Sequence, residues 1–397
     1  MKWPARVATM LFLTLFAFPV FPLKFSNAVF MLLTLATLLM FIIKPISIGK
    51  TMFQNLVFIL PFVPYLIEFF TSGFDPLARF EFEKKLFFFT APLIIPVFLK
   101  ITGFKNYKIP VLIFSLSVTL LTIYSFSYLL AKGLLADPSY YENGAFILRD
   151  NFEHISGLHP TYYSIFALCG GSFFYCNLSA CKKALRIAGI VMATLLFVSV
   201  LLLAVRITII ILLIIILTHI FLKKISVLKK AAWILSTLLL MTLLIFCVPS
   251  LKARFGEIIT WADGNSFQEN TISQRKMITD CSWMVFSENI LWGTGSRFFQ
   301  DELNACYSTK GWEDKDQSFN PHNQYLTEGI AYGIFVLLTF LVCLFWIFKK
   351  IIIIPEARYF MIAVILVFFS ESILERQMGV YFFGLLSILF YNIEDRL

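Results

Sequence analysis

The longest apolar run in the chain, residues 187–222, is too long to form one straight membrane helix. At 1.5 Å per residue it would reach about 54 Å, whereas the hydrocarbon layer of a bilayer is about 30 Å thick. The run therefore has to fold back on itself, and Arg206 marks the expected turn. Similar runs recur along the chain, in which 59% of the residues are hydrophobic and only 14% are charged. This composition excludes a soluble protein of this length and indicates an integral membrane protein.

Twelve apolar segments have the length expected of membrane helices, when about 20 residues form one crossing. They lie near residues 7–22, 27–43, 54–70, 86–100, 110–131, 161–177, 185–204, 207–222, 231–249, 323–348, 357–371 and 377–393. We therefore predict an all-α integral membrane protein with about twelve transmembrane helices. Its predicted parts are spans one to nine in 1–249, a large outer loop in 250–322, and spans ten to twelve in 323–397.

The distribution of charge predicts how these spans are oriented. With the N-terminus inside, the inner segments hold more than half of the 33 Lys and Arg residues. Among the 24 Asp and Glu residues, only Glu356, Glu394 and Asp395 fall inside. This asymmetry follows the positive-inside rule, so we expect both termini in the cytoplasm and the large loop outside. The orientation of the chain in the bilayer explains the net charge of +9. We expect no nucleic-acid partner, because the basic residues form no patch interleaved with aromatic side chains.

The large outer segment is predicted to contain an amphipathic helix over residues 272–288, where apolar residues repeat at intervals of three and four. Either Ser273 or Asn270 is expected to cap it. Arg275 then lies in the first turn, where helix N–H groups favour an anion, so it is either a phosphate ligand or a solvated surface arginine. The following Gly293–Ser296 segment lacks the spacing of a phosphate-binding loop and is interpreted as a turn.

Two cysteines and an acidic run also lie in this outer segment. Cys281 and Cys306 are either joined in a disulfide, which an oxidising compartment permits, or remain two buried thiols. Glu313, Asp314 and Asp316 are either metal ligands or a solvated acidic face, and the second is the more usual arrangement. No spacing is typical of a zinc site, so we expect neither a metal nor another cofactor.

Polar side chains open two further spans at the predicted outer face. Arg206 lies between two aliphatic spans, where a guanidinium is either functional or extends to the lipid headgroups. His159 and Tyr162 lie at the start of span six on the same face. His159 is either part of a substrate rim or a helix-start residue bonded to the backbone.

The start of span ten carries the most concentrated polar group. In Asn320-Pro321-His322-Asn323 we expect Asn320 to be the N-cap and Pro321 the first helical residue. His322 and Asn323 then occupy the first turn. The positive end of a helix disfavours an imidazolium, so His322 is predicted to stay neutral and able to accept a proton.

These motifs, in this order, resemble the pattern of the O-antigen ligase and polymerase superfamily of bacterial envelope polysaccharide assembly, and look closest to lipopolysaccharide O-antigen ligases. One motif is an arginine that opens a span after a hydrophobic hairpin, Ala204-Val205-Arg206. The next is a loop arginine in Ser273-Gln274-Arg275, followed by the turn at Ile290–Gly295. The last is the histidine–asparagine pair of Pro321-His322-Asn323. The resemblance covers about residues 155–395.

The resemblance implies a GT-C-like glycosyltransferase of the bacterial inner membrane, with its active site facing the periplasm. A glycan on undecaprenyl diphosphate would pass, with inversion, to an acceptor hydroxyl, which in the ligases belongs to the lipid A-core. It further implies that His322 is the general base and that Arg206 and Arg275 bind the diphosphate, without a metal. The residues expected to support the site or bind the acceptor are His159, Tyr162, Gln274, Asn323, Glu371 and Arg376.

Glu371 and Glu375 are predicted to align along a helix between spans eleven and twelve, beside Arg376. These three side chains either bind hydroxyls of the acceptor sugar or pair with one another. An O-antigen or exopolysaccharide polymerase and a protein O-oligosaccharyltransferase need the same donor chemistry and remain alternatives. A polysaccharide flippase or other transporter is expected to carry charged or broken helices near the middle of the bilayer. Here the charges gather at the predicted outer rim, which favours an enzyme.

Overall fold

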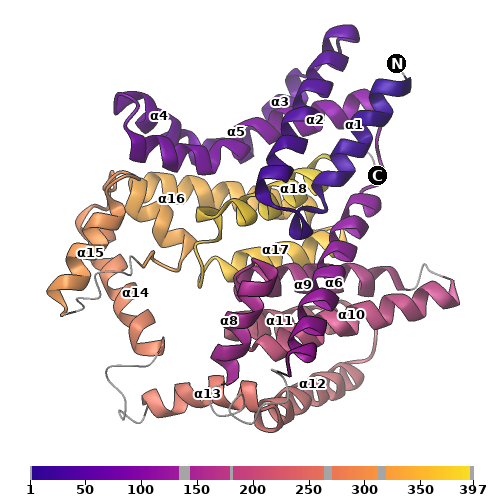
Figure 1. Cartoon of the computed structure of the whole chain (residues 1–397), viewed down its shortest axis with the longest axis vertical. Coiled ribbons are helices and arrows are strands. Elements are labelled where there is room, and N and C mark those ends of the chain that lie inside the picture. Colours follow the sequence, from indigo (N-terminus) through magenta and orange to yellow (C-terminus); the bar gives the residue numbers. More distant parts are fainter. Residues whose placement is uncertain (1, 134–143, 179–181, 263–270, 312–318, 394–397) are drawn as a thin grey trace. The chain divides into compact units, whose positions relative to one another are not determined.

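The computed structural model describes residues 2–133, 144–178, 182–262, 271–311 and 319–393, and within them every regular element is a helix (Figure 1). The prediction of an all-α chain is therefore confirmed for this part of the sequence. The chain packs as two compact units, of which the first contains Met1–Ile113, Gln274–Arg358 and Phe368–Leu397. The second contains Phe114–Ser273 and Tyr359–Val367. The predicted division at 249 and 322 concerns membrane crossings rather than packing, so it stays a prediction.

Helices of the first unit come from both ends of the sequence. They are α1 (Lys2–Leu15), α2 (Leu23–Ile43), α3 (Gly49–Asn55), α4 (Val63–Thr71), α5 (Pro76–Thr102), most of α14 (Thr271–Glu288), α15 (Phe299–Thr309), α16 (Gln324–Ile351) and α18 (Gln377–Ile393). Short 3-10 helices η1 (Phe18–Val20), η2 (Leu56–Phe58), η3 (Leu60–Phe62) and η5 (Ile373–Glu375) join them. The observed α14 confirms the helix predicted over residues 272–288.

Consecutive helices make up most of the second unit. They are most of α6 (Lys108–Ala131), then α8 (Gly144–Ser156), α9 (Pro160–Asn177), α10 (Lys183–Leu203), α11 (Arg206–Leu222), α12 (Val227–Cys247) and α13 (Pro249–Ala262), joined by most of α17 (Pro355–Val367). The apolar run 187–222 is interrupted just before Arg206, where a turn was predicted. Ala204 has a left-handed backbone (φ 49°), Val205 is extended, and α11 begins at Arg206.

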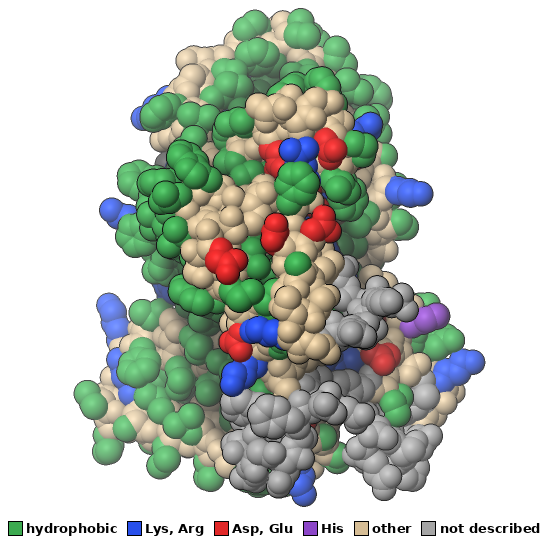
Figure 2. Space-filling view, turned by 90° about the vertical axis from the view of Figure 1, so that its left-hand side faces the viewer, with side chains coloured by type: hydrophobic (Ala, Val, Ile, Leu, Met, Phe, Trp, Pro, Cys, Tyr) green, Lys and Arg blue, Asp and Glu red, His purple; other side chains and the backbone are tan. Residues whose placement is uncertain are grey.

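Six helices in the described residues are long and apolar enough to cross a bilayer: Leu23–Ile43, Pro76–Thr102, Lys108–Ala131, Lys183–Leu203, Val227–Cys247 and Gln324–Ile351. A seventh crossing results if Gly49–Phe58 and Leu60–Thr71, which meet at a bend of 54°, form one span. Helices α11 and α18 are apolar but shorter. Figure 2 shows hydrophobic side chains spread over the viewed face, with the charged ones in small groups. The chain is a multi-pass membrane protein, whereas the number of twelve crossings stays a prediction.

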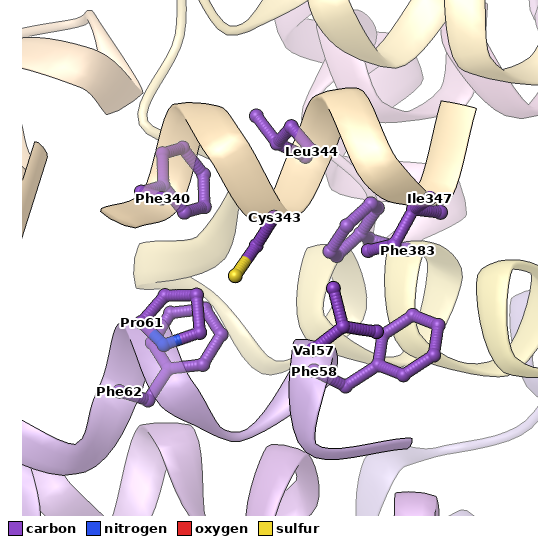
Figure 3. A pocket seen from close by; sticks show the side chains of 9 residues that line it. All are labelled: Val57, Phe58, Pro61, Phe62, Phe340, Cys343, Leu344, Ile347 and Phe383. Atoms are coloured by element: carbon purple, nitrogen blue, oxygen red, sulfur yellow. The ribbon is translucent and has the colours of Figure 1, made fainter. Parts of the chain in front are cut away.

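Aromatic side chains fill the space between the bent helix pair and α16. Phe58 and Phe62 from the bent pair face Phe340 and Cys343 of α16 and Phe383 of α18 across a small pocket (Figure 3). The ring of Phe62 also packs against Phe340, with centroids 6.3 Å apart. The pocket lining carries no carboxylate, amine or imidazole, so it offers packing rather than acid–base chemistry.

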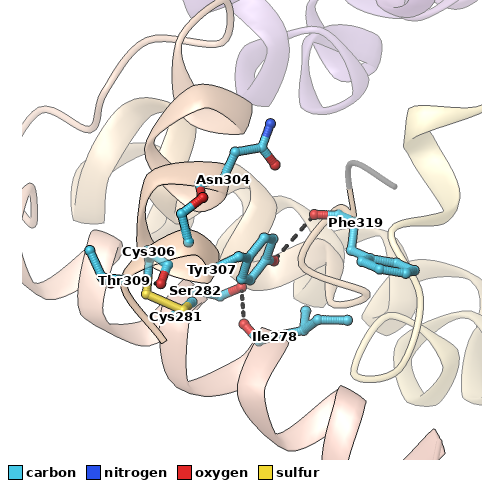
Figure 4. The surroundings of a disulfide bond; sticks show 9 residues. Ile278, Cys281, Ser282, Asn304, Cys306, Tyr307, Thr309 and Phe319 are labelled. Atoms are coloured by element: carbon cyan, nitrogen blue, oxygen red, sulfur yellow. Dashed lines mark hydrogen bonds between the residues drawn. A yellow bond between two sulfur atoms is a disulfide. The ribbon is translucent and has the colours of Figure 1, made fainter. Parts of the chain in front are cut away.

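Outside the candidate spans, α14 and α15 pack on the first part of α16. The structure joins Cys281 of α14 to Cys306 of α15 by a disulfide, so the bridged alternative is the one observed (Figure 4). Ile278, Leu303 and Ile330 are buried in the same cluster. The hydroxyl of Tyr307 donates a hydrogen bond of 3.2 Å to the carbonyl of Phe319. The disulfide-bonded helix pair thereby anchors the chain three residues before His322.

Candidate functional site

The start of α16 differs from the prediction. Asn323, not Asn320, is the N-cap, and its side chain accepts a hydrogen bond of 3.1 Å from the backbone N–H of Leu326. Asn320 instead accepts the backbone N–H of His322 through its side-chain oxygen, at 3.0 Å. This local turn gives His322 a left-handed backbone (φ 45°), which is incompatible with the helix. His322 therefore lies just before the cap, outside the first turn, and the helix-end argument for its neutral ring does not apply.

A carboxylate orients the His322 ring. Nδ1 of His322 lies 3.1 Å from Oε2 of Glu371. The His322 side chain is 30% exposed, whereas that of Glu371 is 8% exposed. An ionised carboxylate only accepts hydrogen bonds, so the proton of a neutral His322 ring belongs on Nδ1. Nε2 then keeps its lone pair, which is the form that a general base needs.

The same carboxylate binds Arg275. Nη2 of Arg275 lies 3.1 Å from Oε1 of Glu371, and Nη1 donates to the carbonyl of Ser370 at 3.4 Å. Glu371 thus joins α14 to the start of α16. The Arg275 side chain remains 48% exposed, so it is paired and still open to a ligand. Of the two predicted caps of α14, Ser273 lies inside the helix and Asn270 lies outside the described residues.

Glu371 and Glu375 do not align along a helix, contrary to the prediction. Glu371 lies in irregular chain and Glu375 ends η5. Two hydrogen bonds connect this segment to the start of α16. The side-chain oxygen of Gln324 accepts the N–H of Leu374 at 2.8 Å. The hydroxyl of Ser372 accepts the N–H of Asn323 at 3.2 Å. The first bond takes up a backbone N–H of the segment, and the two bonds together fasten the segment that carries Glu371 to the start of α16.

Glu375 pairs with two lysines that the sequence analysis did not single out. Its carboxylate oxygens lie 2.7 Å from Nζ of Lys84 and 2.7 Å from Nζ of Lys85. Burial alone raises the pKa of Glu375, but the charges of Lys85 and Lys84 outweigh it and hold the pKa below its usual value. Lys85 is fully buried and also donates to the carbonyl of Leu374 at 2.7 Å. The sequence does carry a signal for this cluster. Lys84 and Lys85 are adjacent lysines on the predicted outer side, where the positive-inside rule disfavours them.

Arg206 is held by α13 in the second unit. Its Nε donates to the carbonyl of Arg254 at 2.9 Å, and its Nη2 bonds Oε2 of Glu257. Arg254 donates from Nη1 to the other oxygen of Glu257 at 2.9 Å. Burial, together with the charges of Arg149 and Arg206, lowers the pKa of Arg254 to about 10 against the opposing effect of Glu257. Arg206 is therefore held by contacts to α13.

The remaining predicted residues divide between the two units. His159 is the N-cap of α9, and its Nδ1 accepts the N–H of Thr161 at 3.3 Å, which matches the helix-start alternative. Tyr162 follows in the same helix and is buried. Gln274 precedes Arg275 in α14, and Arg376 is exposed before α18.

The first unit brings His322, Asn323, Arg275 and Glu371 together, whereas Arg206, His159 and Tyr162 belong to the second unit. The acidic run at Glu313, Asp314 and Asp316 lies outside the described residues.

Comparison with known proteins agrees with the motifs. Residues 190–341 match the family model described as O-antigen ligase. The matched region contains Arg206, Arg275 and His322, whereas Glu371 lies beyond its end. No curated protein matches the chain. The family points to an enzyme with O-antigen ligase or polymerase type activity. Residues 190–341 are therefore similar to the O-antigen ligase family, which supports the resemblance found in the motifs.

Proposed function

We propose that the protein transfers a glycan from undecaprenyl diphosphate to the lipid A-core at the periplasmic face of the inner membrane, as an O-antigen ligase. The observation that carries this proposal is the pair formed by His322 and Glu371, with Nδ1 and Oε2 at 3.1 Å. A ring fixed through Nδ1 and 30% exposed can present Nε2 to a substrate hydroxyl.

In the proposed reaction, the hydroxyl oxygen of the acceptor attacks the anomeric carbon of the donor. Nε2 of His322 accepts the hydroxyl proton as the new glycosidic bond forms. The bond between the anomeric carbon and the diphosphate oxygen breaks, and undecaprenyl diphosphate leaves with the electron pair. A single displacement inverts the anomeric centre. Glu371 keeps the ring in the correct tautomer and stabilises the imidazolium after the proton arrives, as the carboxylate does in hydrolase triads.

Arg275 and Arg206 supply positive charge for the leaving diphosphate. A guanidinium presents several N–H donors in a fixed plane, which suits phosphate oxygens and remains charged at any physiological pH. Arg275 uses Nη2 for Glu371 and is 48% exposed, so part of its donor set is open to a ligand. Preorganised donors that face a developing charge are worth several kcal/mol in an enclosed site. In this scheme the two arginines make a metal unnecessary.

A polymerase of the same superfamily is the second candidate, because the matched family points to either activity. A deletion of the gene, followed by gel analysis of lipopolysaccharide, separates the two. Bare core with accumulated lipid-linked polymer supports a ligase, whereas core that bears one unit supports a polymerase. Normal lipopolysaccharide would rule out both.

The base is tested by His322→Ala in membranes supplied with lipid-linked glycan and acceptor. Loss of a general base lowers a rate by about 10²- to 10⁴-fold. His154, an exposed histidine of α8, offers a matched control, and His154→Ala should transfer at the normal rate. Full transfer by His322→Ala would remove the assignment of His322 as the general base.

A further inference from the structure

Helix α16 is broken at Gly333. This residue has φ 79° and ψ −174°, so α16 consists of a first half, residues 324–332, and a longer second half. The first half follows directly on Asn323 and His322. The position of His322, the proposed base, therefore depends on this half-helix. A break of this kind leaves backbone groups without their helical partners, and in an apolar setting they need others.

The turn after α14 supplies these partners. The N–H of Thr294 bonds the carbonyl of Ile330 at 2.8 Å, and the N–H of Gly295 bonds that of Ala331 at 2.9 Å. On the far side of the break, the N–H of Ile334 bonds the carbonyl of Ile290 at 2.7 Å. We call this contact between residues 290–296 and the break of α16 the junction.

Two glycines make the junction possible. A Cβ atom on Gly293 would lie 2.4 Å from the backbone nitrogen of Tyr332. A Cβ atom on Gly333 would lie 2.3 Å from the carbonyl oxygen of Leu291. Any side chain at either position would push the two backbones apart. The junction is therefore a close backbone contact that depends on both glycines. It connects α14, which carries Arg275, to the half-helix that follows His322.

One carboxylate from α4 binds both sides of the junction. Oε2 of Glu68 accepts the backbone N–H of Ser296 at 3.0 Å and its hydroxyl at 2.6 Å. The same oxygen accepts the hydroxyl of Tyr332, which precedes the break, at 2.7 Å. Nε of Arg297 lies 3.5 Å from Oε1. One helical turn earlier, the hydroxyl of Tyr65 donates to Glu328 at 3.1 Å, so α4 holds the half-helix at two points.

We propose that Glu68 is a positioning residue that clamps the junction and so aligns His322 with Arg275. The inference rests on the proposed function, because the alignment matters only if these two side chains act on one substrate. A half-helix of this length is about 13 Å long, so a tilt of about 5° at the junction moves its far end by about 1 Å. Such a displacement is enough to lower a catalysed rate by one to two orders of magnitude.

The first test measures the junction without using activity. Hydrogen exchange is followed in the purified full-length protein, in wild type and in Glu68→Gln. We expect the amides of Thr294, Gly295 and Ile334 to exchange about tenfold faster in the variant, since an uncharged acceptor makes weaker bonds. Glu83→Gln is the matched control, because Glu83 pairs with Arg79 on an exposed face of α5. Unchanged exchange at the junction would overturn the proposal.

The second test measures transfer. For Glu68→Gln we expect kcat to fall about tenfold, with the KM for lipid-linked donor within about threefold of wild type. The pH profile should keep its shape because the base is unchanged. A raised donor KM with normal kcat would mean that Glu68 binds the donor, which contradicts a positioning role. If Glu68→Gln does not fold, Tyr332→Phe removes one of the three hydrogen bonds and should show both effects in weaker form.

A double variant separates this proposal from the function on which it rests. If Glu68 acts through Tyr332, Glu68→Gln combined with Tyr332→Phe should transfer no more slowly than the slower single variant, whereas multiplied losses would contradict the clamp. If His322→Ala retains full transfer, the proposed base fails. The exchange measurement then still decides whether Glu68 holds the junction.

Discussion

The start of α16, which follows His322, and the start of α11, where Arg206 lies, hold their polar side chains in different ways. At α16 the side chain of Asn323 caps the start of the helix, and His322, the proposed base, lies just before the cap. At α11 the N-cap is Val205, whose apolar side chain cannot make a capping hydrogen bond, and Arg206 is the first helical residue. His322 and Arg206 nevertheless each contact a glutamate that also binds another side chain, an arginine in both cases.

This difference assigns different tasks to the two glutamates. Glu371 contacts a ring nitrogen and so favours one tautomer of His322, which affects the rate if His322 is the general base as proposed. Glu257 contacts a guanidinium, which has no tautomer to control, and so fixes only its position. Removing the carboxylate of Glu371 should therefore lower the transfer rate more than removing that of Glu257.

The largest effect is expected from Glu371→Gln. An amide can donate to Nδ1 and so allow the unreactive tautomer of His322, and we expect the transfer rate to fall about 10³-fold. The rate is measured in membranes with saturating donor and acceptor. A rate within a few fold of wild type would mean that the contact between Glu371 and His322 is only structural.

Arg206→Ala should have the next largest effect. If Arg206 binds the diphosphate as proposed, losing its guanidinium lowers kcat/KM for the donor by about 10²-fold. Arg206→Lys is the informative companion, because it keeps the charge but loses the planar pair of donors, and it should recover only part of the loss. Equal donor dependence in all three proteins would remove Arg206 from the donor site.

A smaller effect is expected from Glu257→Gln. This change leaves Arg206 in place but weakens one of its two fixed contacts, so kcat/KM for the donor should fall about tenfold, the equivalent of one charge-assisted hydrogen bond. The comparison with Glu371→Gln is made in the same assay. An increase in kcat/KM would show that Glu257 competes with the donor for Arg206, which is the opposite role.

The smallest effect concerns the cap itself. Asn323→Ala removes the side-chain bond to Leu326 and should lower the free energy of unfolding by about 1 kcal/mol, measured by thermal unfolding in detergent. Ser226→Ala is the matched control, since Ser226 is the N-cap of α12 but makes no side-chain capping bond. Equal losses in the two variants would contradict the role of Asn323 as a cap.

Local features of the fold could be predicted from the sequence. The turn at Arg206 follows from the length of the apolar run, and α14 follows from its apolar repeat. The cap of α16 could not be chosen correctly, because Asn320 and Asn323 are both good capping residues and Pro321 favours the wrong one. What decides between them is the bond from Asn320 to the N–H of His322, which no spacing rule reveals.

Contacts between distant segments account for the rest. Glu371 lies far along the sequence from His322, and its place beside the ring depends on bonds such as that between Gln324 and Leu374. The break in α16 was also missed, because one glycine in an apolar span is tolerated in many helices. The need for glycine at 293 and 333 becomes evident only from the close approach of the two backbones.

We propose that Glu371 acts through His322, and a double-mutant cycle on these two residues measures their coupling. Transfer rates are compared for wild type, Glu371→Gln, His322→Ala and the double variant in the same membranes. We expect Glu371→Gln to cause its large loss only when His322 is present, so that the double variant matches His322→Ala. If Glu371→Gln lowers the residual rate of His322→Ala by the same factor as in wild type, the two residues act independently and Glu371 does not act through His322.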